Sequence, residues 1–277
     1  MTESLVSKAA NRVFSAARMA KYRLGQRSGP AIVPSDAPDD ALGELEAVTA
    51  STRFPGWLNV PASIVTLHLL RILPTGPVME IGVFRGKYLS ILRGALGASG
   101  RIVGYDIFDQ AQAPLIETDF AEVFGTLGNV RLVQVDSTRL TPDRVLADCG
   151  GAPVFISIDG SHEGDPVLSD MTLAVAVMDE AGIVAMDDFL NPVALGVNEA
   201  VGRFMCAPDP GLVPFAYVAN KLFMCRPAFH AAYLRSVEEH MVQRGNDPSF
   251  PFWVENIAQG EDLRRRFYGW DVLIVTG

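Results

Sequence analysis

Three aspartates stand at the ends of two short apolar runs and could together hold a cation. Asp159 follows the strand expected over 153–158, while Asp187 and Asp188 close the strand expected over 182–187. The carboxyl ends of parallel strands meet at one edge of a sheet, so these acids are expected to converge. Like charges held close together raise one another's pKa or recruit a cation, and an all-oxygen set suits Mg²⁺, Ca²⁺ or Mn²⁺. In the alternative, one aspartate caps a helix and another faces solvent.

The turn after the first expected strand carries a second group of residues suited to binding. It reads Glu80-Ile81-Gly82-Val83-Phe84-Arg85-Gly86 and opens directly into a helix. Doubly wound sheets bind nucleotide-like ligands at such turns, and glycine lets the backbone approach a ligand closely. The spacing E-x-G-x-x-x-G lacks the second glycine of the dinucleotide pattern G-x-G-x-x-G, which disfavours NAD. A packing turn without a ligand is the alternative.

Polar residues also end the second and third expected strands. Asp106 lies roughly twenty residues beyond Gly86, where an acid is placed to accept hydrogen bonds from both hydroxyls of a ribose. Asp136 and Ser137 end the third strand and could face an adenine ring. In the alternative, Asp106 only caps the following loop, and an Asp-Ser pair also starts turns. Taken with the first turn, these positions predict a cofactor that contains a nucleoside.

These residues need a parallel sheet to position them, and the pattern from Pro61 onward predicts one. A mostly apolar helix starts there and stops before Pro74 and Gly76. Apolar runs then alternate with helical stretches, which implies βαβ units and a sheet covered on both faces. The expected strands are 77–82, 101–106, 130–135, 153–158 and 182–187, the expected helices are 86–97, 114–127, 141–148, 165–179 and 193–206, and an antiparallel pair at 213–218 and 222–226 turns at Ala219-Asn220-Lys221.

Over about residues 60–226 the chain resembles the class I S-adenosylmethionine-dependent methyltransferases. Within that family it is similar to a bacterial group with D-G-x-H after the fourth strand and D-D after the fifth. The resemblance implies a doubly wound α/β fold, a Rossmann-like, mostly parallel sheet of seven strands with one reversed strand, under a helical N-terminal cover. The most specific matches are Ile158-Asp159-Gly160-Ser161-His162, Met186-Asp187-Asp188-Phe189-Leu190-Asn191-Pro192, Gly196-Val197 and Ala200-Val201. The chain departs from the group at Glu163-Gly164-Asp165, where an aromatic is usual, and at Glu180-Ala181-Gly182, where Gly-Gly is usual.

The resemblance also implies where the cofactor S-adenosylmethionine binds. Glu80, Gly82 and Gly86 would line its methionine and ribose side, and Asp106 would hold the ribose. The remaining cofactor contacts are expected from Asp136, Ser137 and Asp159.

In metal-dependent O-methyltransferases of the catechol and macrolide-sugar types, acids after the fourth and fifth strands ligate Mg²⁺. They map onto Asp159, Asp187 and Asp188. His162 occupies the offset at which catechol enzymes carry a lysine general base, and a histidine with a pKa near neutrality suits removal of a hydroxyl proton. The sequence therefore predicts Asp159 and His162 as the catalytic pair. A structural histidine is the alternative for His162.

The predicted activity is metal-assisted O-methylation of a small molecule, either a natural product, a sugar or a phenol. Acceptor contacts are expected from Phe54, Trp57 and Leu58 and from the loop that contains Phe189 and Asn191. Two alternatives stay open. One is a non-catalytic cofactor-binding or assembly protein with the methyltransferase fold, and the other is an NAD-linked oxidoreductase.

The chain divides into three expected parts. Residues 1–60 form an N-terminal helical segment, linker and cover, 61–227 form the cofactor-binding domain, and 228–277 form an extension packed on it. Within the first part, residues 1–30 are net basic and could form an amphipathic helix that touches a membrane surface or a partner, or a solvated one. Residues 31–47 are acidic and proline-bearing and read as a linker.

Composition narrows the classes of function. The formal charge of −9 argues against nucleic-acid binding and favours a small-molecule acceptor. Three scattered cysteines suit neither a disulfide framework nor a zinc site, which fits the reducing cytoplasm. No apolar run approaches the roughly 20 residues that span a bilayer, so integral membrane association is not expected. The sequence leaves the oligomeric state open, a homo-oligomer included.

Overall fold

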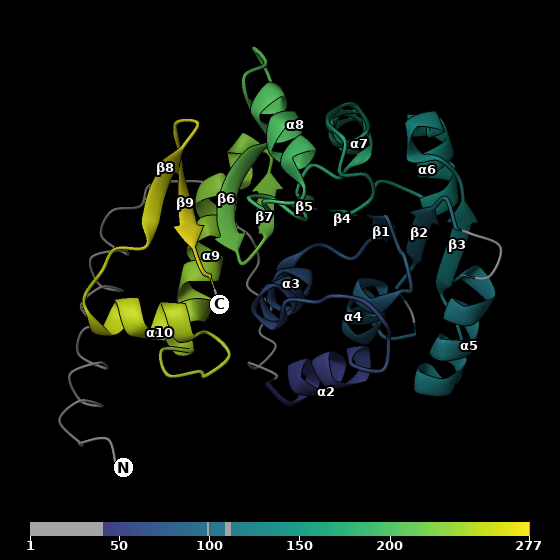
Figure 1. Cartoon of the computed structure of the whole chain (residues 1–277), viewed down its shortest axis with the longest axis horizontal. Coiled ribbons are helices and arrows are strands. Elements are labelled where there is room, and N and C mark those ends of the chain that lie inside the picture. Colours follow the sequence, from purple (N-terminus) through teal and green to yellow (C-terminus); the bar gives the residue numbers. More distant parts are fainter. Residues whose placement is uncertain (1–40, 99, 109–111, 277) are drawn as a thin grey trace.

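A single mixed sheet of nine strands forms the centre of the protein. The structure is a computed structural model, and it describes residues 41–98, 100–108 and 112–276. The strands lie in the order β3-β2-β1-β4-β5-β7-β6-β9-β8 (Figure 1). The first five in this order are parallel, and β7 then runs antiparallel between β5 and β6. The strands are β1 Val78–Ile81, β2 Ile102–Asp106, β3 Val130–Gln134, β4 Phe155–Ile158, β5 Ile183–Met186, β6 Val213–Val218, β7 Lys221–Cys225, β8 Arg264–Phe267 and β9 Trp270–Ile274.

Helices cover both faces of this sheet, as expected for parallel strands joined by crossovers. In Figure 1, α3, α4 and α5 lie on one side and α6, α7 and α8 on the other. Two separate clusters of buried apolar side chains correspond to these two faces. The helices are α2 Ala41–Ser51, α3 Val60–Ile72, α4 Lys87–Leu96, α5 Gln112–Phe124, α6 Pro142–Cys149, α7 Gly164–Val177, α8 Leu195–Met205, α9 His230–Gln243 and α10 Pro251–Ala258, with short 3-10 turns at η1 Ser137–Arg139 and η2 Pro227–Phe229.

Alternation along the central strands decides which side chains meet at the sheet edge. In β1, Val78 belongs to the core under α3 and α4, whereas Met79 and Ile81 belong to the core under α7. Because successive side chains of a strand point to opposite faces, Glu80 faces α3 and α4. All four residues of β1 are buried, as in a strand covered on both sides.

The sheet has nine strands rather than the seven expected, because the C-terminal residues extend it. The strand β9 pairs parallel to β6, with Leu273 opposite Ala216, and β8 pairs antiparallel to β9. Pairing with β9 buries Val272 and Leu273 and covers what would otherwise be an apolar edge at β6. The new edge strand β8 begins with the charged run Arg264–Arg266, which suits a solvent-facing edge and gives no apolar strand signal.

The N-terminal prediction is partly wrong and partly untested. Residues 41–47, expected in a linker, belong to helix α2, which packs on α3 and α4. The basic segment 1–30 lies outside the described residues. Within the described part of the chain, no helix is both long and apolar enough to span a membrane.

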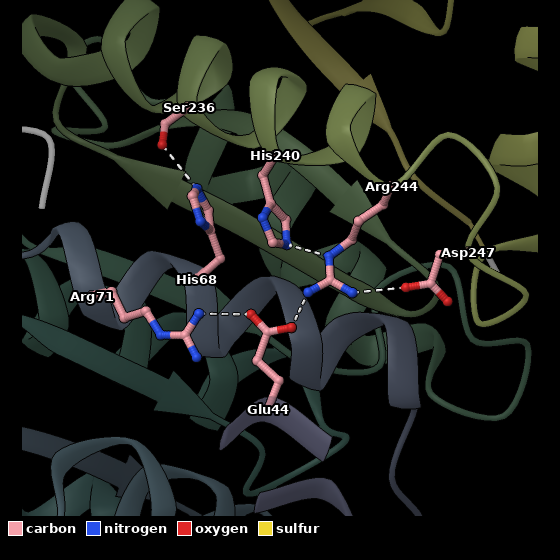
Figure 2. Close-up of polar contacts among 7 residues, drawn as sticks. All are labelled: Glu44, His68, Arg71, Ser236, His240, Arg244 and Asp247. Carbon is pink, nitrogen blue, oxygen red and sulfur yellow. Dashed lines mark hydrogen bonds and ion pairs between the residues drawn. The ribbon is translucent and has the colours of Figure 1, made fainter. Parts of the chain in front are cut away.

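A buried polar network ties α2 to α3 and α9 (Figure 2). Glu44 forms ion pairs with Arg71, at 2.9 Å, and with Arg244. His240 stacks on His68 with 4.1 Å between ring centroids, and its Nε2 accepts a hydrogen bond from Arg244 Nε at 3.0 Å. Burial, together with the neighbouring His68, Arg244 and Arg71, lowers the pKa of His240 to about 2.

This arrangement predicts that acid weakens the fold through His240. The folded protein keeps His240 neutral, while the unfolded chain takes up a proton below a pKa of about 6.5, so its contribution is lost as pH falls below that value. Relative to His240→Gln, the wild type should lose up to about 1.4 kcal/mol of unfolding free energy per pH unit between pH 6.5 and 5. Urea unfolding of both proteins measures this difference. The comparison also cancels the opposite effect of buried acids such as Asp170, whose pKa burial raises to about 6. An unchanged difference across this range would contradict the prediction.

Candidate active site

The turn between β1 and α4 has the tight geometry that its glycines predict. Gly82 and Gly86 adopt φ values of 85° and 80°, in the left-handed region that favours glycine. A Cβ atom on Gly82 would lie 1.9 Å from the carbonyl oxygen of Asp159, so only glycine allows the turn after β1 to approach the turn after β4 this closely. The two turns therefore form one continuous surface at the carboxyl edge.

Asp106 joins the ends of β1 and β2. Its Oδ2 accepts hydrogen bonds from the backbone N–H groups of Val83 at 2.7 Å and Phe84 at 2.8 Å, and its Oδ1 accepts one from Phe108 N–H at 2.9 Å. A carboxylate has about four lone-pair sites, so these bonds leave room for a further donor. Asp106 thus fixes the shape of the glycine turn beside it.

The polar pair after β3 serves mainly as a local cap. Asp136 is exposed, and its Oδ1 accepts hydrogen bonds from Thr138 N–H at 3.0 Å and Thr138 Oγ1 at 2.7 Å. These bonds lower the pKa of Asp136. Asp136 therefore acts as a turn-starting residue, which was the alternative at this position. Contact of Asp136 or of the half-buried Ser137 with a ligand stays a prediction.

A buried lysine lies among the acids on the face of the sheet that packs under α3 and α4. Lys221, the first residue of β7, has a side chain only 3% exposed, and its Nζ lies 3.0 Å from Asp187 Oδ2. Nζ also lies 4.2 Å from the ring centroid of Tyr88. In this cluster, Glu80 Oε2 and Asp187 Oδ1 are among the buried polar atoms that have no hydrogen-bond partner in the described part of the chain.

The charges of this cluster are unevenly shared. Burial raises the pKa of Glu80 well above its usual value, against the opposing effect of Lys221. Burial and the neighbouring Asp187 raise the pKa of Asp159 in the same way. Burial also disfavours ionisation of Asp187, but the Lys221 ammonium and hydrogen bonds outweigh it and lower the pKa of Asp187. Asp187 is therefore the acid that carries the negative charge opposite Lys221.

Asp188 belongs to a different set of contacts. Its Oδ2 lies 2.9 Å from His162 Nε2, and its Oδ1 accepts hydrogen bonds from the side-chain amides of Asn191 at 2.7 Å and Asn220 at 3.1 Å. Asp188 has a φ of 54°, which turns the chain sharply after β5. The His162 side chain is 48% exposed, so a solute can reach it, while its Asp188 partner is mostly covered.

The predicted metal residues do not all come together. In the described part of the chain, the one group of three potential ligands within 4.8 Å of one another is Asp159, His162 and Asp188. Asp187 is not in this group. It continues the alternation of β5 onto the face shared with Lys221, whereas Asp188 turns toward His162.

Sequence reasoning missed Lys221 and Asn220. The turn was expected to contain Ala219, Asn220 and Lys221, but Val218 pairs with Lys221, so only two residues form the turn. Ala219 adopts a φ of 56°, as tight two-residue hairpins require. The hairpin signal was present, and a one-residue shift in its register concealed the buried lysine.

Two of the expected acceptor contacts are core residues instead. Phe54 is buried against Phe120, with ring centroids 5.0 Å apart, and Phe189 is buried against Phe267, with centroids 5.5 Å apart. Trp57, by contrast, is fully exposed. Of these three aromatic residues, only Trp57 is available to a solute without repacking the core.

Comparison with known proteins agrees with this architecture. Residues 79–189 match a family model described as a methyltransferase domain. An S-adenosylhomocysteine-bound methyltransferase from Podospora anserina shares the fold at a TM-score of 0.50, with 15% identity over 76% of this chain and 95% of that one. A TDP-rhamnose 3′-O-methyltransferase of calicheamicin biosynthesis gives a TM-score of 0.46, with 20% identity over 69% of this chain and 96% of that one. The third is the MycE methyltransferase of mycinamycin biosynthesis, in complex with Mg, S-adenosylhomocysteine and mycinamycin VI. It gives a TM-score of 0.49, with 19% identity over 69% of this chain and 55% of that one.

A search of curated proteins finds no significant match. The family match nevertheless spans the strands and turns that build the site, from β1 through β5. The glycine turn after β1, the acid at the end of β2 and the parallel sheet followed by a reversed strand all lie where the sequence predicts them. Residues 79–189 of the chain thus match a methyltransferase domain, and they lie in the doubly wound sheet that the sequence predicts.

Proposed function

We propose that this protein transfers a methyl group from S-adenosylmethionine to a hydroxyl oxygen of a small molecule at the carboxyl edge of the sheet. The observation that carries the proposal is the contact of 2.9 Å between His162 and Asp188, one strand away from the glycine turn. A base held by a fixed carboxylate is the element that O-methylation needs and that cofactor binding alone does not.

The cofactor would lie across the ends of β1, β2 and β4. Glu80, Gly82 and Gly86 would border its methionine and ribose, Asp106 would accept from the ribose hydroxyls, and Asp159 would border the reacting end. The Podospora anserina protein of the same fold holds S-adenosylhomocysteine, which supports this choice of ligand. We assign Asp136 and Ser137 to the adenine side.

His162 would act as the general base. The Asp188 carboxylate can only accept a hydrogen bond, so His162 Nε2 carries the hydrogen and Nδ1 is left to take the proton from the acceptor hydroxyl. Asp188 would then stabilise the imidazolium that forms. Asn191 and Asn220 hold Asp188 from the other side and keep this pair oriented.

S-adenosylmethionine supplies a methyl group already activated by its sulfonium. The protein therefore has to orient the acceptor oxygen, remove its proton and exclude competing nucleophiles. Orientation and proton removal each account for large rate factors, about 10²–10⁴ for a positioned base. A small acceptor is favoured because the acidic protein gives no electrostatic attraction to a phosphate backbone.

The residues do not fit the three-carboxylate Mg²⁺ site that the sequence predicts. Asp187 pairs with Lys221, and Asp188 already engages one imidazole and two amides. A cation held by Asp159, His162 and Asp188 would be a mixed oxygen and nitrogen site, which suits transition metals better than Mg²⁺. Because His162 would then be a ligand and no longer a base, we derive no step through a metal.

Methyl transfer from ¹³C-methyl S-adenosylmethionine tests the function. The protein is incubated with a catechol, a nucleotide-linked deoxysugar and a glycosylated macrolide as acceptors, with mass spectrometry for S-adenosylhomocysteine and carbon NMR for the labelled product. We expect equal amounts of S-adenosylhomocysteine and of a product whose label is bonded to oxygen. A label on nitrogen or carbon would contradict O-methylation, and cofactor binding without turnover for any acceptor would favour the non-catalytic alternative.

A further inference from the structure

We propose that the ammonium group of Lys221 supplies the positive charge for the buried acids Glu80, Asp159 and Asp187, in place of a divalent metal ion. The protein consequently binds no divalent ion at Asp159 and Asp187. The inference rests on the proposed function for the location of the site. It concerns a residue at the start of β7 that lies outside the glycine turn and outside the His162–Asp188 pair.

Strand alternation places the cluster on one face. Ile183 and Ala185 of β5 belong to the core under α3 and α4, so Asp187 continues onto that face, and Phe155 of β4 places Asp159 there by the same count. Phe223 and Cys225 belong to this core as well, which puts Lys221 on the same side. Glu80, Asp159, Asp187 and Lys221 therefore form a row across β1, β4, β5 and β7.

The ammonium lies where a metal ion would have to compete with it. Its Nζ is 3.0 Å from Asp187 Oδ2 and makes an ion pair there without a well-aligned hydrogen bond. The Tyr88 ring lies on another side of Nζ, and the Tyr88 hydroxyl is in turn hydrogen-bonded to Thr66 at 2.8 Å. A divalent ion bound to Asp187 would stand beside a buried positive charge and be repelled by it.

The same contacts explain what Lys221 contributes to the site. Without a cation, the buried negative charge of Asp187 would have no opposite charge beside it, next to Glu80 and Asp159. A divalent ion satisfies such a cluster in metal-dependent sites, and one buried ammonium supplies a fixed positive charge here without exchange with solvent. Lys221 is thus a positioning residue that keeps Asp187 in place beside Asp159.

Mn²⁺ binding to the full chain tests this inference without turnover. Electron paramagnetic resonance of free Mn²⁺ reports how much ion is bound, in wild type, Lys221→Met and the charge-conserving Lys221→Arg. We expect no stoichiometric binding to wild type or to Lys221→Arg, and one bound Mn²⁺ in Lys221→Met. Adding Asp187→Asn to Lys221→Met should abolish that binding.

Thermal unfolding with and without Mn²⁺ keeps the inference testable even if Lys221→Met folds poorly. Because a ligand that binds only the folded state stabilises it, Mn²⁺ should raise the Tm of Lys221→Met, or restore its folding, and leave wild type unchanged. Stoichiometric Mn²⁺ binding by wild type that Asp187→Asn abolishes overturns the proposal, as does a Lys221→Met protein that neither binds nor is stabilised by Mn²⁺. Inactive wild type that shows the expected Mn²⁺ behaviour would count against the proposed function alone.

Discussion

Replacing His162 by alanine is expected to lower kcat by about 10²–10⁴-fold while leaving cofactor affinity and Tm close to wild type. The loss follows because the variant lacks the imidazole whose Nε2 lies 2.9 Å from Asp188 Oδ2. Among the residues that the structure describes, His162 is the only base in contact with Asp188. The fold should tolerate the change because nearly half of the His162 side chain is exposed. Steady-state rates with an identified acceptor and calorimetric titration with S-adenosylhomocysteine measure the two effects separately.

Ser161→Ala is the matched control for this experiment. Ser161 lies in the same loop, and its Oγ accepts a hydrogen bond from Glu163 N–H at 3.1 Å, so its loss perturbs the loop without removing the imidazole. We expect a change of rate well below that of His162→Ala. Equal losses in both variants would show that loop shape matters and the base does not, and an unchanged rate in His162→Ala would refute the assignment of the base.

Among the variants of His162, Ser161, Asp106 and Asp209, we expect Asp106→Ala to lose the most affinity for the cofactor. The variant loses the acceptor for the ribose hydroxyls and also leaves the N–H groups of Val83 and Phe84 without their partner. Charge-assisted hydrogen bonds contribute about 1.5–3 kcal/mol each, so S-adenosylhomocysteine should bind about 10–150-fold more weakly for each ribose bond lost. Calorimetry gives the affinity, and amide hydrogen exchange reports opening of the glycine turn.

Asp209→Ala provides the corresponding control at the opposite edge of the sheet. Asp209 Oδ1 accepts a hydrogen bond from Gly211 N–H at 3.2 Å just before β6 begins, so it resembles Asp106 as a turn acceptor but lies away from the cofactor turn. Its replacement should leave cofactor affinity unchanged. Equal affinity of Asp106→Ala and wild type would rule out the proposed placement of the ribose.

The sequence predicted the central sheet because its signals are local. Buried strands such as β1 and β5 are short apolar runs, and the glycine and acid at their ends mark the turns directly. The strand β8 escaped detection because Arg264–Arg266 give no apolar alternation; pairing with β9 and the ion pair between Arg264 and the buried Glu238 hold the strand instead. Sequence periodicity reports the burial of apolar side chains, so a strand held by backbone pairing and ion pairs is hard to recognise from it.

The site was harder to predict because it depends on side-chain direction. Neighbouring aspartates look equivalent in a motif, yet Asp187 meets Lys221 and Asp188 meets His162. A shift of one residue in the β6–β7 hairpin separates a turn lysine from a buried one, and periodicity cannot resolve one residue. The positions of candidate residues along the chain were therefore predictable, while their partners required the three-dimensional register.

Calorimetric titration of the wild-type protein with S-adenosylhomocysteine, and separately with NAD⁺, tests the central claim most directly because it needs no acceptor. The glycine turn and Asp106 predict saturable binding of one S-adenosylhomocysteine per chain and no detectable binding of NAD⁺ at the same concentrations. Binding of NAD⁺ in preference to S-adenosylhomocysteine, or binding of neither, would contradict the account.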